Sequence, residues 1–164
     1  MRNLFLTLAA LLFILPVAVN SNIYAQESPI QLSLFNPVQI VPETKSITGL
    51  RLSLLYGKNA NVSGLDVGLV NVTTGNQVGL QYGVVGYNEG DFNGWQDNLV
   101  SITKGNLMGL QTGAVNYTAG KTTGLQIAIV NYSATMNGLQ LGLINIIGKG
   151  GFLPIFPIFN FCFE

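Results

Sequence analysis

A row of polar side chains recurs at a regular spacing and is the best candidate for chemistry in this chain. Each member is the third residue of a segment that begins with glycine. The row consists of Arg51, Asp66, Gln81, Gln96, Gln111, Gln126 and Gln140. Glutamine amides donate and accept hydrogen bonds but do not exchange protons near neutral pH. The row therefore indicates binding or structure, and we interpret Arg51 and Asp66 as an ion pair that replaces one glutamine contact.

The other reactive residue types give no catalytic site. The chain has no histidine, which removes the commonest general base and metal ligand. The acidic residues Asp66, Glu89, Asp91 and Asp97 are too scattered for an acid–base pair or a calcium site. Cys162 is the only cysteine and lies among phenylalanines, so we expect an inert apolar side chain. We expect a protein that is not an enzyme, with no metal and no cofactor.

Composition limits the class of protein further. The chain has 164 residues, of which 9% are charged, and its seven basic and seven acidic residues give a formal net charge of zero. Its mean hydropathy is +0.43. These values are typical of one small domain with much apolar surface, and they give no basic patch for nucleic acid. The oligomeric state and any protein partner stay open.

The first 25 residues have the pattern of a signal peptide. Arg2 precedes an apolar run over residues 4–19, and Ala25 ends a plausible cleavage site. The run is shorter than the roughly 20 residues that span a bilayer, which disfavours the alternative of an uncleaved anchor. We expect export and a single β-repeat domain over residues 26–164.

Seven related segments fill most of that domain. Their first glycines follow one another at intervals of 15 residues, with 14 for the last interval, and are Gly49, Gly64, Gly79, Gly94, Gly109, Gly124 and Gly138. Frequent glycines disfavour helix, whereas Val, Ile, Leu, Tyr and Thr between them favour strands. We expect all-β structure with seven repeats over 47–150, a leading strand or cap over 26–46 and a Phe-rich strand or cap over 151–164.

Five polar, glycine-containing clusters are expected to form the turns between the strands. They are residues 57–59, 74–76, 89–91, 104–106 and 119–121.

Alternation divides each repeat into two faces. Counting from the first glycine, the second and sixth positions are apolar throughout, and the fourth is apolar except at Asp97 and Thr112. The opposite face carries the polar row, small residues at the fifth position and tyrosines at the ninth. This pattern predicts one leucine-rich surface and one surface of small and polar side chains.

Two architectures fit these faces. In a small antiparallel meander closed into a β-barrel, the leucines would face lipid and the polar row would line a narrow lumen. In a parallel β-solenoid, each repeat would form one coil and Asn71, Asn116, Asn131 and Asn145 would stack as a ladder. We favour the barrel, although it places Asp97 against lipid; the identical turn in every repeat favours the solenoid.

The segments over residues 64–71, 109–116, 124–131 and 138–145 also carry a family resemblance. They are similar to the GLQxGLVN-type tandem units of a bacterial surface-repeat family first grouped around spirochaete surface lipoproteins. The resemblance implies an exported, envelope-associated protein of unassigned activity, although this chain lacks the lipidation cysteine of the lipoprotein members. A second motif, Gln111, Gly113 and Asn116, is similar to the repeats of curli fibre subunits, whose units are longer.

Together these observations predict a non-enzymatic protein with a structural or interaction role in the outer membrane or at the cell surface, with the periplasm as the alternative location. A narrow outer-membrane pore with Arg51, Asp66 and the glutamines in its lumen is the alternative function. A fibre-forming solenoid subunit is a more remote alternative.

Overall fold

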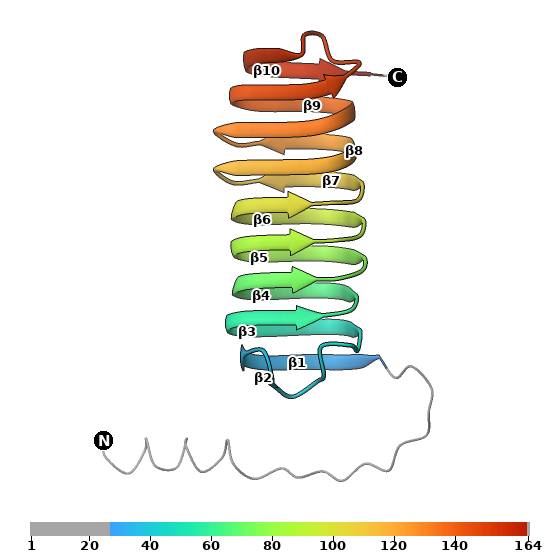
Figure 1. The fold of residues 1–164 in the computed structure, drawn as a ribbon, viewed down its shortest axis with the longest axis vertical. Helices are drawn as coiled ribbons and strands as arrows, with labels where there is room; N and C mark the ends of the chain where they lie inside the picture. The colour runs from blue at the N-terminus through green and yellow to red at the C-terminus, as the bar shows by residue number, and fades with distance from the viewer. Residues whose placement is uncertain (1–26, 164) are drawn as a thin grey trace, which may run out of the picture.

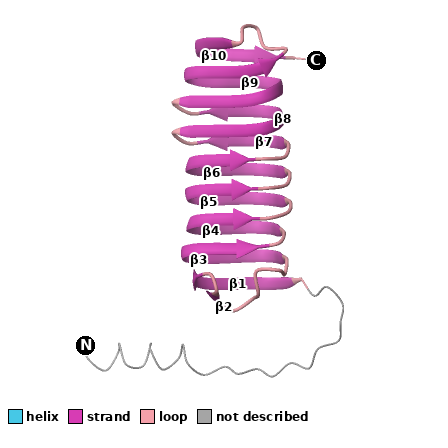
Figure 2. Ribbon diagram, in the orientation of Figure 1, coloured by secondary structure: helices cyan, strands magenta, loops and turns pink. Residues whose placement is uncertain are grey.

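The computed structural model describes residues 27–163, and these residues form a tall column of stacked β-coils (Figure 1). Strands and the loops between them make up the whole column, with no helix among the described residues (Figure 2). The expected signal peptide lies outside the described residues. The strands are β1 (Ser28–Phe35), β2 (Val38–Gln39), β3 (Ile47–Asn59), β4 (Val62–Thr73), β5 (Gln77–Asn88), β6 (Phe92–Thr103), β7 (Leu107–Thr112), β8 (Val115–Ile127), β9 (Val130–Lys149) and β10 (Ile155–Cys162).

Neighbouring strands from β3 to β9 run parallel, with equivalent repeat positions paired. Gly64 lies opposite Gly79, and Gly79 lies opposite Gly94. The all-β prediction and the 15-residue repeat are confirmed, and the column is a parallel β-solenoid of about 8 turns. The favoured antiparallel meander or barrel is wrong, because a coil of constant length returns each repeat position to the same place and so stacks like on like.

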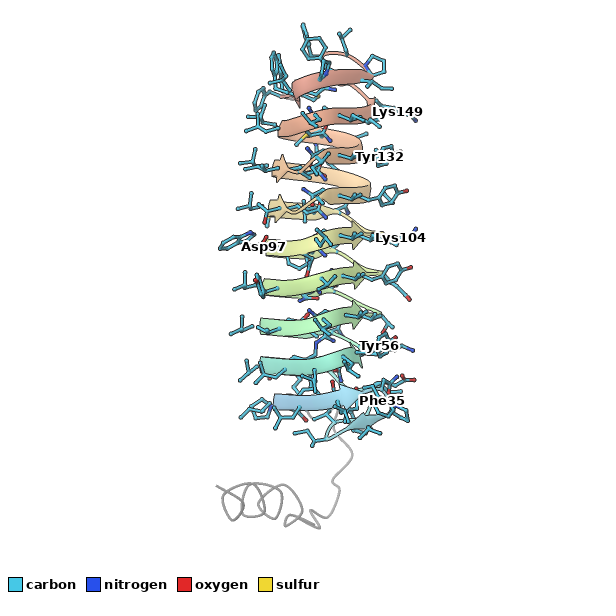
Figure 3. All side chains as sticks on the ribbon, turned by 90° about the vertical axis from the view of Figure 1, so that its left-hand side faces the viewer. Phe35, Tyr56, Asp97, Lys104, Tyr132 and Lys149 are labelled. Atoms are coloured by element: carbon cyan, nitrogen blue, oxygen red, sulfur yellow. The ribbon has the colours of Figure 1, made fainter. Side chains whose placement is uncertain are left out.

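Each coil folds back on itself at a bend, so that it has two outward faces. Positions three, five, eight, ten and fourteen point inward, whereas positions six and seven both point outward. We call the outward surface at positions two, four and six the leucine face, and the one at positions seven and nine the tyrosine face. Figure 3 shows Asp97 on the first and Tyr56, Lys104 and Tyr132 on the opposite side. The prediction that the third and ninth positions share a face is wrong, because the bend shifts the alternation by one residue.

The turns lie on one edge of the column. The clusters at 74–76, 89–91 and 104–106 are turns as expected, but residues 57–59 lie within β3 and residues 119–121 within β8. A ladder of side chains links successive turns: Asn61 Oδ1 accepts from the backbone N–H of Asn76 at 2.9 Å, and Asn76 Oδ1 accepts from that of Asp91 at 2.9 Å. These bonds hold each turn to the next one.

The N-terminal end of the column is closed by β1 and β2. β1 pairs parallel with β3, and β2 turns back to pair antiparallel with β1. The side chain of Gln31 accepts from the backbone N–H of Val41 and donates to its carbonyl, both at 2.9 Å. Val41 then packs with Ile47 and Val62 in a small buried cluster. Asn36 donates to Glu43 nearby, and this bond together with the charge of Lys58 lowers the pKa of the Glu43 carboxyl.

The C-terminal end is closed by a strand of opposite direction. β10 pairs antiparallel with β9, with a register shift around Pro157. Cys162 packs against Met136 and Ile147, in agreement with an apolar role for this thiol. Phenylalanine rings of this segment make a series of stacked and edge-to-face contacts with one another. Because proline lacks an amide donor and β10 reverses direction, this end does not present the parallel ladder that another coil would need.

Gly109 tests the in-register stacking. It has φ +128°, and a Cβ there would lie 2.1 Å from the carbonyl oxygen of Gly94 in the preceding coil. We expect Gly109→Ala to lower the free energy of unfolding by about 2–4 kcal/mol, because the methyl group is incompatible with this backbone and with the neighbouring coil. Urea denaturation followed by circular dichroism measures this loss.

Gly148→Ala is the matched control, since its Cβ would lie 3.0 Å from the carbonyl oxygen of Ala134 near the end of the column. Equal losses for the two variants would contradict close stacking at the first repeat position.

Candidate functional site: a buried polar ladder and an exposed leucine face

The seven residues of the third-position row stack inside the column. All seven are fully buried. Each glutamine donates to the one before it: Gln96 to Gln81 at 2.8 Å, Gln111 to Gln96 at 2.7 Å, Gln126 to Gln111 at 2.6 Å and Gln140 to Gln126 at 2.8 Å. The acceptor of the last member, Gln140 Oε1, has no hydrogen-bond partner within residues 27–163. The row is thus a directional chain of amides in a filled interior.

Arg51 and Asp66 begin this chain as a bidentate ion pair. Arg51 Nε and Nη2 donate to the two carboxylate oxygens of Asp66 at 2.7 and 2.6 Å. Both charged groups make further hydrogen bonds. Arg51 Nη1 donates to the carbonyl of Val72 at 2.8 Å, and the side chains of Gln77 and Gln81 donate to the Asp66 carboxylate at 2.9 and 3.1 Å. The expected ion pair is present, and these hydrogen bonds offset part of the cost of burying two charges.

A second ladder, of asparagine side chains, occupies the eighth position. The sequence analysis expected this ladder only if the repeats formed a solenoid. Asn116 donates to Asn131 at 3.0 Å, and Asn131 donates to Asn145 at 2.9 Å. The coil of β6 has Ser101 at this position, and Asn98 at the fifth position replaces the missing amide by donating to both Ser101 and Gln81 at 3.2 Å. Sequence reasoning missed Asn98, although an asparagine where other repeats have Gly, Ala or Ser is the signal that could have found it.

The outer surface carries the apolar side chains that a globular protein would bury. On the leucine face, Leu54 is 63% exposed, Leu99 57%, Ile129 54% and Leu143 68%. These residues continue along the column from one coil to the next, so their side chains form one apolar surface. Contiguous apolar patches of more than a few hundred Å² are rare on monomeric soluble proteins and mark interaction sites.

A hydrogen-bonded polar group lies in the middle of the leucine face. Thr112 donates to the Asp97 carboxylate at 2.6 Å and accepts from the Trp95 indole N–H at 2.9 Å. Asp97 therefore points outward, as expected of the fourth position. It lies on the outer surface of a solenoid, however, and not on the lipid-facing wall of a barrel. Thr112 and Ala114 make the surface of their coil shallower than its neighbours.

The N-terminal half of the leucine face contains a groove of about 1160 Å³. Its two ridges are the side chains at positions four and six, and its floor is formed by the small residues at position five. The ridge residues are Leu52, Val67, Tyr82, Leu54, Leu69 and Val84, and Val38 and Ile40 extend the groove to the end of the column. The lining is apolar, so the groove suits an apolar side chain or ligand.

The tyrosine face differs in chemistry. The rings of Tyr117 and Tyr132 stack with centroids 4.8 Å apart, and Lys104 Nζ lies 5.4 Å from the centroid of the Tyr117 ring. Lysines and tyrosines thus make this face amphipathic, whereas the leucine face carries one charge, that of Asp97.

Within residues 27–163, no group of three or more His, Cys, Asp or Glu side chains is arranged to hold a metal ion. This part of the chain also has no helix of the length and hydropathy needed to cross a membrane. Comparisons with protein-family models, curated proteins and solved structures found no match for this chain. The resemblance to the surface-repeat family stays a prediction.

The contribution of the buried ion pair to stability can be tested by replacing its two members with glutamine, the residue that the other repeats have at this position. Arg51→Gln alone leaves the buried Asp66 carboxylate without its counter-charge, and we expect the free energy of unfolding to fall by about 3–5 kcal/mol. Arg51→Gln combined with Asp66→Gln extends the glutamine row by two members, and we expect it to recover most of that loss. Urea denaturation of both variants gives the comparison, and a double variant as unstable as the single one would contradict the interchangeability of ion pair and amides.

Proposed function

We propose that this protein is an exported, non-enzymatic protein of the cell envelope with a structural or interaction role, and that it acts by docking its leucine face. The observation that carries the proposal is the exposure of Leu54, Leu99, Ile129 and Leu143 along one side of a rigid column. Successive coils are joined by the parallel backbone ladder and by side-chain hydrogen bonds in the interior, so the outward leucines are not the main link between them. A large apolar surface that the fold does not use is available for a partner.

Location in the envelope is supported by the sequence alone. The apolar run over residues 4–19 and the cleavage site at Ala25 favour export. Outer membrane or cell surface is the proposed destination, with the periplasm as the alternative. The pore alternative has no support from the described residues, because the glutamine row lies in a filled interior with no exposed surface.

A fibre subunit is the second candidate function. Parallel coils in register, with stacked asparagine and glutamine side chains, have the ladder geometry of cross-β fibres. The two ends oppose growth along the column, since β2 and β10 both pair antiparallel with their neighbours. A fibre of this protein would therefore have to grow by lateral contacts.

Cell fractionation tests the envelope role. The full chain, expressed in a bacterium with two membranes, is expected in the envelope fraction, and a chain without residues 2–25 is expected to stay in the cytoplasm. Leu99→Asp combined with Ile129→Asp places charge on the leucine face, and we expect at least about tenfold less protein to be retained in the envelope after a carbonate wash, because burying a carboxylate against an apolar partner is costly.

The control places the same charges on the tyrosine face. Val72→Asp combined with Ile102→Asp changes outward residues of the ninth position, two coils apart as in the test variant. We expect normal retention of this control. Equal retention of the leucine-face variant and the unchanged protein would contradict docking through the leucine face.

A further inference from the structure

The leucine face is large enough for a stable protein–protein interface. A coil spacing of about 4.8 Å and a rise of about 3.3 Å per residue give this face a size of roughly 38 Å by 20 Å. The resulting area, about 700–800 Å² per molecule, is close to the roughly 800 Å² that each partner buries in a standard-size complex. A single apolar ligand in the groove would leave most of this surface uncovered.

The charge of the face argues against a lipid surface as its partner. No Lys or Arg occupies the outward second, fourth or sixth positions, and Asp97 is the single charge there. Lys58 pairs with Val72 of the ninth position. Lys104 lies at a turn and Lys149 at the end of β9, and Figure 3 shows both on the side opposite Asp97. Surface-bound proteins ordinarily place basic residues near the lipid phosphates, whereas here a carboxylate lies at the centre of the contact.

The shape of the face is complementary to itself when one copy is turned end for end. Near the middle of the column, the coil of β6 carries Trp95, Asp97 and Leu99, and the next coil carries Leu110, Thr112 and Ala114 at the same positions. A twofold axis that runs along the strands between these coils places the larger set opposite the smaller set. Leu99, which protrudes, then meets Ala114 of the partner copy, where the surface is shallow.

The same axis brings the apolar halves of the face together. The coil that starts at Gly79 faces the one that starts at Gly124, and the coil that starts at Gly64 faces the one that starts at Gly138. Asp97 lies opposite Thr112 of the partner copy. If the copies instead ran in the same direction, each coil would face its own equivalent and the two Asp97 carboxylates would meet, which like charges disfavour.

We infer that two copies of this chain pair through their leucine faces as an antiparallel, twofold-symmetric dimer, in which Leu99 of each copy packs on Ala114 of the other. The inference rests on the proposed docking role of the leucine face and names its occupant. The contact resembles the packing of two β-sheets face to face, with larger side chains of one copy opposite smaller ones of the other near the axis. The Asp97, Thr112 and Trp95 group forms its polar centre.

A swap of two side chains tests this pairing. We expect Ala114→Leu to raise the dimer Kd at least about tenfold, because the added side chain fills the space that Leu99 of the partner copy needs. The variant is compatible with the fold, since the sixth position is outward and holds leucine in four other repeats. Leu99→Ala is also expected to weaken the dimer, and the combination of the two substitutions to restore the original Kd within about threefold. Analytical ultracentrifugation of the purified, exported protein measures each Kd.

Each result supports or overturns the dimer. Recovery in the double variant supports it, because the two substitutions compensate only if residues 99 and 114 meet across copies. A monomer at all concentrations, assemblies that grow without limit, or tighter association of Ala114→Leu would overturn it. Binding of the monomer to phosphatidylcholine vesicles, lost in the Leu99→Asp and Ile129→Asp variant, would overturn the dimer while leaving docking through the leucine face intact. If, in addition, the leucine-face variant were retained in the envelope as well as the unchanged protein, both the dimer and docking through the leucine face would be overturned.

Discussion

The structure depends on hydrogen bonds between identical side chains in successive coils. In the third-position row, the amide N–H of Gln96, Gln111, Gln126 and Gln140 reaches the side-chain carbonyl oxygen of the glutamine one coil earlier. A single such bond contributes only about 0.5–1.5 kcal/mol net, but a buried amide that loses its partner costs about 1–3 kcal/mol. The row therefore specifies register more than it supplies stability, since any slip between coils would leave several buried amides unpaired.

This constraint reverses the usual distribution of polarity. The narrow interior is filled by amides, hydroxyls and one ion pair, with small apolar clusters mainly near the ends of the column. The leucines that would form the core of a globular domain are outside, where they cover one side of the column. The same repeat thus accounts for the fold through its inward positions and for the proposed docking role through its outward positions. A repeat that departs from the pattern still keeps polar side chains inside. In the coil of β6, Asn98 supplies the amide that Ser101 lacks.

Much of the architecture could be predicted from the repeat, but one step could not. The constant spacing of the first glycines identified the strands, the 15-residue unit and the ion pair between Arg51 and Asp66. The prediction of antiparallel neighbouring strands was wrong. Apolar and polar residues alternate in the same way in a barrel strand and in a solenoid coil, so the pattern does not reveal strand direction. The bend after the sixth position was also missed. It places Asn71 and Asn116 inside and the tyrosines outside, and only the combination of polar eighth and tenth positions could have indicated it.

The most direct test of the account is a disulfide between neighbouring coils. Ile102 and Tyr117 are paired across parallel strands on the tyrosine face, and adjacent coils place their Cα atoms about 4.8 Å apart, within the range that a disulfide spans. In a Cys162→Ser background, Ile102→Cys with Tyr117→Cys is expected to form this bond on mild oxidation. Ile102→Cys with Tyr132→Cys, two coils apart at about 9.6 Å, is expected not to form it. Peptide mapping by mass spectrometry reads out both, and the absence of a bridge in the first variant would contradict parallel coils in register.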